Sequence, residues 1–568
     1  MKKNIFICCI CLLSILSMNA QTFDWARAFG GTTADEGTAI DSDDNGNIYT
    51  TGFFSGTVDF DTGPNTFNLS TLGLYNVFIQ KMDASGNFVW VKSFETTSSG
   101  SYVQTTDIHI DASGNIYTVG NFKGDIDFDP GSGTVIRSAS NSRFFVHKMD
   151  ASGNYMWVET FGDNSYYDKA QSIVTDASGN VYVTGAFSGT TDFEPGTGVH
   201  NLTAAGLEDI FILKLDALGG FVWAKSVGGG FHDQGLSIDL DGSNNVYITG
   251  FFHDTVDFDP GAGIFNLSAN GLNSDIFILK LDVSGNFVWA KSIGGTDLDL
   301  GQSIAVDDTG NTYLTGNFSA TVDFDPGPGV SELISEGDTD VFVMKMDDQG
   351  NLLWAKSFGA TGSADQGTSL DIDASGNVYV TGAFRFTVDF NPGQGIYALT
   401  SNGYRDVFIL KLNDSGQFIW AKSFGGNNGD WGNSIIVDSS DNIYTTGYFE
   451  NTVGFDTGTG TWVITSSGAR DIFVHKMRQT TTGISGNNAL NHTKFYPNPS
   501  SGKFAIELGK KYDHIHISIK DIAGKIMYAK SFIDTQKINI NLNEVPSGLY
   551  FVQIYAGEKN TMIKWIKN

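Results

Sequence analysis

The sequence predicts an all-β protein in which one four-stranded unit is repeated and is followed by a small antiparallel domain. Glycine accounts for 69 of the 568 residues and aromatic residues for 13%, whereas only 17% are charged. This composition is typical of short strands joined by tight turns, and it excludes a coiled coil or a charge-driven disordered chain. A fixed period of 65 to 67 residues separates successive tryptophans at positions 25, 90, 157, 223, 289, 354 and 420.

Each repeat of about 66 residues contains four short apolar segments. In the fifth repeat these are residues 303–306, 312–318, 341–346 and 352–358. They are rich in β-branched and aromatic residues and are bounded by turns of Asp, Gly and Asn, which predicts strands. Four antiparallel strands per repeat, arranged in a ring, are the β-propeller architecture. A blade packs between two neighbours, so both of its faces must be apolar or small.

The two ends of the repeated region predict how the ring closes. The seventh repeat ends with the segment 471–477 and has no tryptophan strand, whereas the chain begins with an unmatched tryptophan strand at 23–29. Placing that strand in the last blade completes it and leaves no open edge. A linear solenoid would need distinct capping repeats, which the sequence lacks. We therefore expect a seven-bladed propeller over residues 21–477, with its last blade closed by residues 23–29.

The first 20 residues have the features of a secretory signal peptide. Lys2 and Lys3 form a basic start, residues 5–16 are apolar, and Ala20 offers a small side chain for cleavage. The apolar run is too short to span a bilayer, and no later segment is long and apolar enough, so we expect no transmembrane segment. All three cysteines lie in this leader, so the mature chain has no thiol for disulfides or zinc.

A change of charge marks a separate C-terminal unit. Residues 21–486 hold 21 basic and 57 acidic side chains, whereas residues 487–568 hold 11 lysines and 6 acidic side chains. The polar stretch 478–492 reads as a linker. Period-two apolar patterns at 504–508, 514–520, 537–542 and 550–555 then predict a small antiparallel β-sandwich over residues 493–568.

This C-terminal unit resembles the type A sorting domain of the type IX secretion system of Bacteroidota. The resemblance rests on FYPNPSSG at 495–502, DIAGK at 521–525 and VPSGLYFV at 545–552. It implies that the secretion machinery recognises the domain and that the protein reaches the outer-membrane surface or the medium. The residues that carry this signal are Tyr496, Pro497, Asn498, Pro499, Gly502, Gly524, Gly548 and Tyr550. The alternative is an ordinary fibronectin-like module.

The repeats resemble the SBBP family of bacterial β-propeller repeats. The matching segments are GNVYVTG at 179–185, DIFILKLD at 209–216 and FVWAKS at 221–226. This resemblance is specific for the fold and weak for function, because propellers host binding modules and enzymes alike.

The sequence contains no recognisable catalytic motif. Its nine histidines are scattered, and no zinc-protease, serine-hydrolase or phosphate-loop pattern is present. We therefore expect a protein that is not an enzyme. The acidic composition also argues against nucleic acid, whose phosphates require Lys and Arg.

One acidic position recurs just before the first strand of six repeats. If that strand is innermost, these carboxylates lie near one mouth of the central channel and are candidate binding residues. Clustered carboxylates can be neutralised by Ca²⁺, which makes calcium a possible ligand although no cofactor is required. The alternative is that each aspartate caps a local turn, and the sequence leaves the question of a metal open. The six residues are Asp35, Asp168, Asp233, Asp299, Asp365 and Asp430.

Together these features predict a secreted, cell-surface propeller that acts as a monomer. We expect it to bind an extracellular glycan or protein. One alternative is a propeller enzyme, a hydrolase or lyase, acting on polysaccharide with carboxylates as acid and base. The other is a passive surface scaffold.

Overall fold

The computed structural model describes residues 19–162, 168–271, 273–456, 462–481, 493–521, 525–556 and 559–568. All regular elements in these ranges are strands, which confirms the predicted all-β class. The chain forms two compact units, one of which is Phe23–Arg478, while the other holds Gln479–Asn568. Residues 1–18 of the predicted signal peptide and residues 482–492 of the predicted linker lie outside the described residues.

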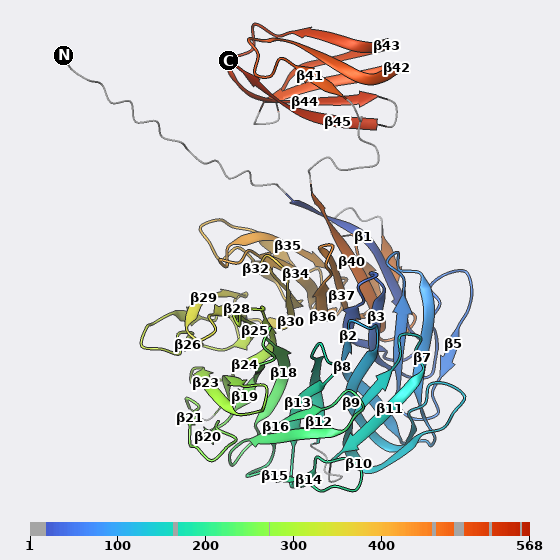
Figure 1. Cartoon of the computed structure of the whole chain (residues 1–568), viewed down its shortest axis with the longest axis vertical. Coiled ribbons are helices and arrows are strands. Elements are labelled where there is room, and N and C mark those ends of the chain that lie inside the picture. The colour runs from blue at the N-terminus through green and yellow to red at the C-terminus, as the bar shows by residue number, and fades with distance from the viewer. Residues whose placement is uncertain are drawn as a thin grey trace, which may run out of the picture. The chain divides into compact units, whose positions relative to one another are not determined.

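The larger unit is built from repeated antiparallel sheets (Figure 1). One of them consists of β12 (Lys169–Thr175), β13 (Val181–Phe187), β16 (Asp209–Leu215) and β17 (Phe221–Val227), paired in that order. Three further sheets repeat this order: β18 (Gln234–Leu240), β19 (Val246–Phe252), β22 (Asp275–Leu281) and β23 (Phe287–Ile293); β24 (Leu300–Val306), β25 (Thr312–Phe318), β28 (Asp340–Met346) and β29 (Leu352–Phe358); β30 (Gln366–Ile372), β31 (Val378–Phe384), β34 (Asp406–Leu412) and β35 (Phe418–Phe424).

The first two repeats share one eight-stranded sheet. Its halves are joined only where Glu95 and Thr96 of β7 pair with Asp127 and Ile126 of β9. Apart from that junction, each half keeps the four-stranded order of the other repeats. The strands are β2 (Glu36–Ser42), β3 (Ile48–Phe54), β6 (Asn76–Met82), β7 (Phe88–Thr96), β8 (Tyr102–Ile110), β9 (Ile116–Asp127), β10 (Ile136–Met149) and β11 (Tyr155–Phe161).

The last sheet of this unit joins the two ends of the repeat array. Its strands pair in the order β1 (Asn19–Phe29), β40 (Asp471–Thr481), β37 (Asn442–Phe449) and β36 (Trp431–Val437). Trp25, Ala26 and Phe29 of β1 are buried. The Phe29 ring lies 5.7 Å from Phe78 in the first repeat, so β1 packs against that repeat as well as pairing with β40.

Short two-stranded hairpins, which the sequence patterns did not reveal, occupy the connection between the second and third strands of six repeats. Each of their strands has only three residues, too few for a periodic pattern to be visible. The hairpins are β4 (Thr57–Asp59) with β5 (Asn68–Ser70), β14 (Thr190–Asp192) with β15 (Asn201–Thr203), β20 (Thr255–Asp257) with β21 (Asn266–Ser268), β26 (Thr321–Asp323) with β27 (Glu332–Ile334), β32 (Thr387–Asp389) with β33 (Ala398–Thr400), and β38 (Thr452–Gly454) with β39 (Val463–Thr465).

The two central strands of each repeat are apolar on both faces. Every residue of β13 and β16 is buried, and Tyr182 and Ile210 of that sheet share one core cluster with Ile248 and Phe277 of the next. Such a sheet is stable only when another sheet covers each face, because burial of apolar surface is the main favourable term in folding.

The first strands of the repeats contact one another in a continuous circuit. Contacts run from β2 through β8, β12, β18, β24 and β30 to β36, and β36 in turn contacts β2. Figure 1 shows these strands toward the centre of the larger unit. Serine side chains bridge successive members: Ser172 Oγ accepts from the amide of Ile238 (3.4 Å), and Ser434 Oγ accepts from that of Ile40 (3.3 Å).

A glycine in the second strand of each repeat is required by a close backbone approach. The first strand carries a register shift there, between Ala170 and Ser172 in the third repeat. A Cβ at Gly185 would lie 2.0 Å from the carbonyl oxygen of Lys169, which no side chain can tolerate. The repeated Thr-Gly pair therefore reflects the geometry of the innermost strand pair.

The C-terminal unit is one antiparallel sheet of five strands around a core that includes Trp565, Ile517 and Val552. The predicted strands 504–508 and 514–520 are parts of one long strand with a register irregularity between Glu507 and Tyr512, and a last strand was not predicted. The strands are β41 (Lys494–Tyr496), β42 (Lys503–Asp521), β43 (Ile526–Asn541), β44 (Gly548–Ala556) and β45 (Lys559–Lys567).

Deletion of residues 23–29 should destabilise the larger unit strongly. It removes the buried side chains of Trp25 and Phe29, each worth about 3–5 kcal/mol on truncation to alanine, and exposes the edge of β40 to aggregation. We expect a sharply lower melting temperature and concentration-dependent precipitation, measured by circular dichroism and light scattering. A chain that lacks only residues 1–20 is the control. An unchanged melting curve would mean that β1 does not complete the sheet.

Candidate functional site

The six aspartates predicted at the channel mouth are buried, each exposing at most 1% of its surface. In the fourth repeat, Asp233 accepts hydrogen bonds from the amides of Gly229 (2.7 Å, to Oδ2) and His253 (2.9 Å, to Oδ1). Each carboxylate thus ties the turn before its own first strand to the residues after the second strand. Equivalent bonds are made by Asp35, Asp299, Asp365 and Asp430, and Asp168 accepts from the amide of Ser188.

Burial makes most of these carboxyl groups weaker acids than exposed aspartates. It raises the pKa of Asp35, Asp233 and Asp299 to about 6 and that of Asp430 to about 7, and it raises the pKa of Asp365 as well. The bonds from backbone amides oppose this effect without cancelling it. The arrangement matches the alternative in which each aspartate caps a local turn. Among the described residues, no group of three or more His, Cys, Asp or Glu is placed to hold a metal ion.

A second set of carboxylates, which the sequence analysis missed, lies on the innermost strands and links neighbouring repeats. Asp41 accepts from the amide of Ile110, and Asp239 from that of Val306, each at 2.7 Å. Burial raises the pKa of both to about 7. Asp371 makes the equivalent link to Val437, whereas Asp107 accepts from the amide of Ile173 at the position that Ser172 holds in the next repeat. The repeats that hold His109, Val174, Ala305 and Ile436 have no carboxylate at the Asp41 position, so the period gave no signal.

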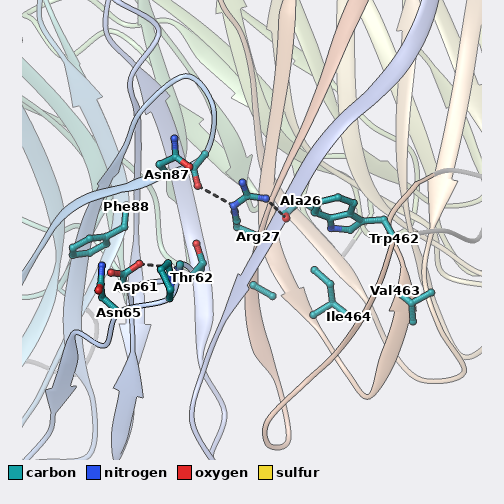
Figure 2. A pocket seen from close by; sticks show the side chains of 14 residues that line it. Ala26, Arg27, Asp61, Thr62, Asn65, Asn87, Phe88, Trp462, Val463 and Ile464 are labelled. Atoms are coloured by element: carbon teal, nitrogen blue, oxygen red, sulfur yellow. Dashed lines mark hydrogen bonds between the residues drawn. The ribbon is translucent and has the colours of Figure 1, made fainter.

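A cleft of about 620 Å³ lies where the last repeat meets the first (Figure 2). One wall consists of Ala26 and Arg27 on β1 with residues 462–464 around the start of β39. The other consists of residues 61–65, between β4 and β5, and residues 86–88 at the start of β7. Trp462 is 39% exposed, and its ring lies 5.6 Å from that of Phe23. We call this cavity the rim cleft.

Polar side chains in the rim cleft are held in defined positions. The Arg27 guanidinium donates to the carbonyl oxygens of Gly86 (2.9 Å) and Ala26 (3.0 Å), and Figure 2 shows it between Asn87 and Trp462. Asp61, which lines the cleft, accepts a hydrogen bond from the amide of Gly63. Sequence reasoning missed this site because its walls come from opposite ends of the repeat array.

In the C-terminal unit, residues 496–499 form an exposed segment that is tied to the last strand. The Asn498 side chain donates to Lys564 O (2.6 Å) and accepts from the amide of Ile566 (2.9 Å). Tyr496 donates to Glu507 (2.8 Å), and the buried Tyr550 donates to Pro546 O (2.8 Å). Pro497 and Pro499 are exposed, as is Gly548, whereas Gly502 is buried with φ +112°. Gly524 lies outside the described residues.

Comparison with known families identifies both parts of the chain. Residues 494–568 match the family model of the secretion system C-terminal sorting domain, and residues 419–448 match that of a beta-propeller repeat. The chain carries a type IX sorting domain and β-propeller repeats. The sorting domain marks proteins that type IX secretion exports to the cell surface or the extracellular space, which confirms the predicted localisation and implies contact with the secretion machinery. No helix able to cross a membrane occurs in the described part of the chain.

Two curated proteins are similar to parts of this chain. An uncharacterized WD repeat-containing protein of Acanthamoeba polyphaga mimivirus is 24% identical over 503 residues, covering 75% of this chain and 36% of its own length. The regulatory protein FlaEY of Caulobacter vibrioides is 27% identical over 171 residues, covering 29% of this chain and 17% of its own length. The chain thus spans about a third of the first relative and less of the second.

The buried aspartates predict that the propeller repeats lose stability as the pH rises. A carboxyl group whose pKa is higher in the folded than in the unfolded state contributes stability at pH values below about 4, and this contribution is lost as the pH rises through the folded pKa. With folded values of about 6 to 7, the free energy of unfolding should fall between pH 5 and pH 8, by about 1–3 kcal/mol per group.

Thermal melts in buffers of equal ionic strength measure this dependence. The double variant Asp233→Asn with Asp299→Asn should melt lower at pH 5, because each amide group faces a backbone N–H, and should show a shallower decline toward pH 8. Asp254→Asn is the control, since Asp254 is exposed and asparagine tolerates its φ of 55°. A wild-type melting temperature that rises steadily from pH 5 to pH 8 would contradict this assignment.

Proposed function

We propose that the larger unit is a closed seven-bladed β-propeller in which β1 supplies the outer strand of the last blade. The proposal is supported by the seven first strands, which contact one another in a circuit that returns to its start. The pairing of β1 with β40 and the match to a beta-propeller repeat support it independently. A closed ring places the rim cleft at the junction where both ends of the array meet.

We further propose that this secreted propeller binds an extracellular glycan in the rim cleft. The observation that carries the proposal is the partly exposed Trp462 ring in the rim cleft, facing Asp61, Asn65 and Asn87 across it. A sugar ring offers an apolar face that stacks on an aromatic ring, and hydroxyl groups that bond to carboxylate and amide side chains.

The alternative function, an enzyme that acts on polysaccharide, is less well supported by the residues of the rim cleft. Glycoside hydrolysis needs two carboxyl groups on opposite sides of the scissile bond, whereas Asp61 is the single acidic residue among those that line the rim cleft. Asp61 already accepts a backbone hydrogen bond, and no neighbouring carboxyl group is available as its partner there. Binding without bond cleavage is therefore the function that the cleft supports best.

A glycan array probed with the purified full chain tests this proposal, followed by calorimetry with the best ligand. We expect Trp462→Ala to weaken binding about tenfold or more, because a stacked aromatic contact contributes on the order of 1 kcal/mol beyond its buried area. Phe265→Ala is the matched control, since Phe265 occupies the same position of the fourth repeat and is also 39% exposed. Equal losses in both variants, or no glycan bound, would reject the site, and release of reducing ends would favour the enzyme.

A further inference from the structure

A row of alternating guanidinium groups and aromatic rings lies where the sixth and seventh repeats meet. The Arg385 guanidinium lies 4.7 Å from the Tyr404 ring, and that of Arg405 lies 4.7 Å from the Trp431 ring. The Trp431 ring stacks on Tyr448 at 6.4 Å with an angle of 16°, and Arg470 lies 4.2 Å from Tyr448. We call these six residues the arginine–aromatic row.

Part of this row faces a pocket of about 340 Å³. Tyr404, Arg405, Trp431, Tyr448 and Arg470 line it, together with Glu450 and residues 427–429. The Tyr404 ring is the most accessible, with 56% of its surface exposed. The pocket lies beside the turn that precedes β36, away from the strands that form the rim cleft.

The guanidinium groups of two of the three arginines make no hydrogen bond to a described residue. Arg470 pairs with Glu450 (3.3 Å) and Glu36 (3.9 Å), whereas the Arg385 and Arg405 side chains form no ion pair within 4 Å in the described part of the chain. The Nε atoms of both are buried without a partner. A buried donor left without a hydrogen bond is costly, and of these two arginines Arg405 is the one that lines the pocket.

The other repeats do not carry these side chains. Arg405 precedes the third long strand of its repeat, a position held by Glu208, Ser274 and Thr339 in the third to fifth repeats. Trp431 begins the first strand, where Gln234, Leu300 and Gln366 stand in the fourth to sixth repeats. Arg470 holds the Arg405 position in the seventh repeat, so the last two repeats share this arginine and the third to fifth repeats lack it.

The charge of the pocket is also opposite to that of its surroundings. Residues 21–486 hold 57 acidic against 21 basic side chains, so the molecule as a whole repels anions. Only Glu450 among the residues that line the pocket is acidic, against Arg405 and Arg470. An anion that binds here must be recognised by local, directed contacts, because long-range attraction is absent.

We propose that this pocket binds the carboxylate of an acidic sugar residue of the hexuronate class. A guanidinium group presents paired N–H donors that match a carboxylate, and no described residue accepts a hydrogen bond from that of Arg405. The Tyr404 ring supplies an exposed face on which a sugar ring stacks. Glu450 and Asn428 supply groups for its hydroxyls. This site is separate from the rim cleft in place and in ligand, and it goes beyond the proposed function.

Calorimetry of the full chain with trigalacturonate at neutral pH tests the proposal, with the neutral galactose trimer and sodium sulfate as comparison ligands. We expect the uronate to bind at least tenfold more tightly than the neutral trimer and than sulfate. Arg405→Thr, which introduces the residue of the fifth repeat, should abolish this preference. Arg405→Lys keeps the charge but loses the paired donors, and should weaken uronate binding severalfold while the melting temperature stays close to that of the wild type.

Arg137→Thr is the matched control, because it removes one arginine from β10 far along the chain from the pocket, and it should leave uronate binding unchanged. Equal affinity for the charged and neutral trimers would overturn the proposal. So would equal affinity for sulfate, uronate binding that survives in both Arg405 variants, or no binding of the uronate at all. These outcomes do not depend on Trp462. Failure of the uronate proposal would therefore not decide whether the rim cleft binds a glycan.

Discussion

The structure depends on sheets that are apolar on both faces. In the third, fifth and sixth repeats every residue of both central strands is buried, and most are buried in the other repeats. No repeat is therefore stable alone, and each needs a neighbour on either side. A linear row of such sheets would leave two apolar faces in water. The contacts of β36 with β2 and the pairing of β1 with β40 cover those faces with the ends of the same chain. The three cysteines are Cys8, Cys9 and Cys11, so packing must supply the stability of the larger unit without disulfides.

Carboxylates fix the polar parts of this arrangement. Asp233 and its equivalents hold the turns within each repeat, whereas Asp41 and Asp239 hold one repeat to the next. Both sets accept bonds from backbone amides that would otherwise be buried without partners, and an unpaired buried amide is costly. The acidic composition of the propeller is thus explained in part by structure. This also explains why a recurring acidic residue is a poor guide to a binding site in a repeat protein.

The sequence was sufficient to predict the elements that periodicity encodes. The tryptophan period, the strands around it and the unmatched strand at 23–29 all have counterparts in the sheets of the structure. Hairpins such as β4 with β5 were missed because each of their strands has only three residues, too few to show a periodic pattern. The burial of Asp233 was not predictable either, because a capping aspartate and a ligand-binding one occupy the same position before a strand. The rim cleft and the arginine–aromatic row depend on residues that interrupt the repeat, so a search for repetition passes over them.

The two candidate binding surfaces share one property, which is departure from the repeat. The rim cleft exists only where the two ends of the array meet, and Trp462 there is larger than its counterparts Phe67, Phe265 and Tyr397. In the arginine–aromatic row, Arg405 stands where three other repeats have Glu208, Ser274 or Thr339, and Trp431 stands where three others have Gln234, Leu300 or Gln366. Repeats that are nearly alike provide a rigid frame, and the few side chains that differ provide specificity. The sorting domain adds export to this frame.

Native-state hydrogen exchange at the junction of the first and last repeats tests most directly whether the array closes. The amide of Ile40 donates to Ser434 across that junction, as the amide of Leu370 donates to Ser303 between the fifth and sixth repeats. A closed ring predicts that peptides covering β2 and β30 are protected to a similar degree, within about tenfold, since both strands open only with the whole ring. Exchange in β2 at the rate of an exposed strand, while β30 stays protected, would contradict closure.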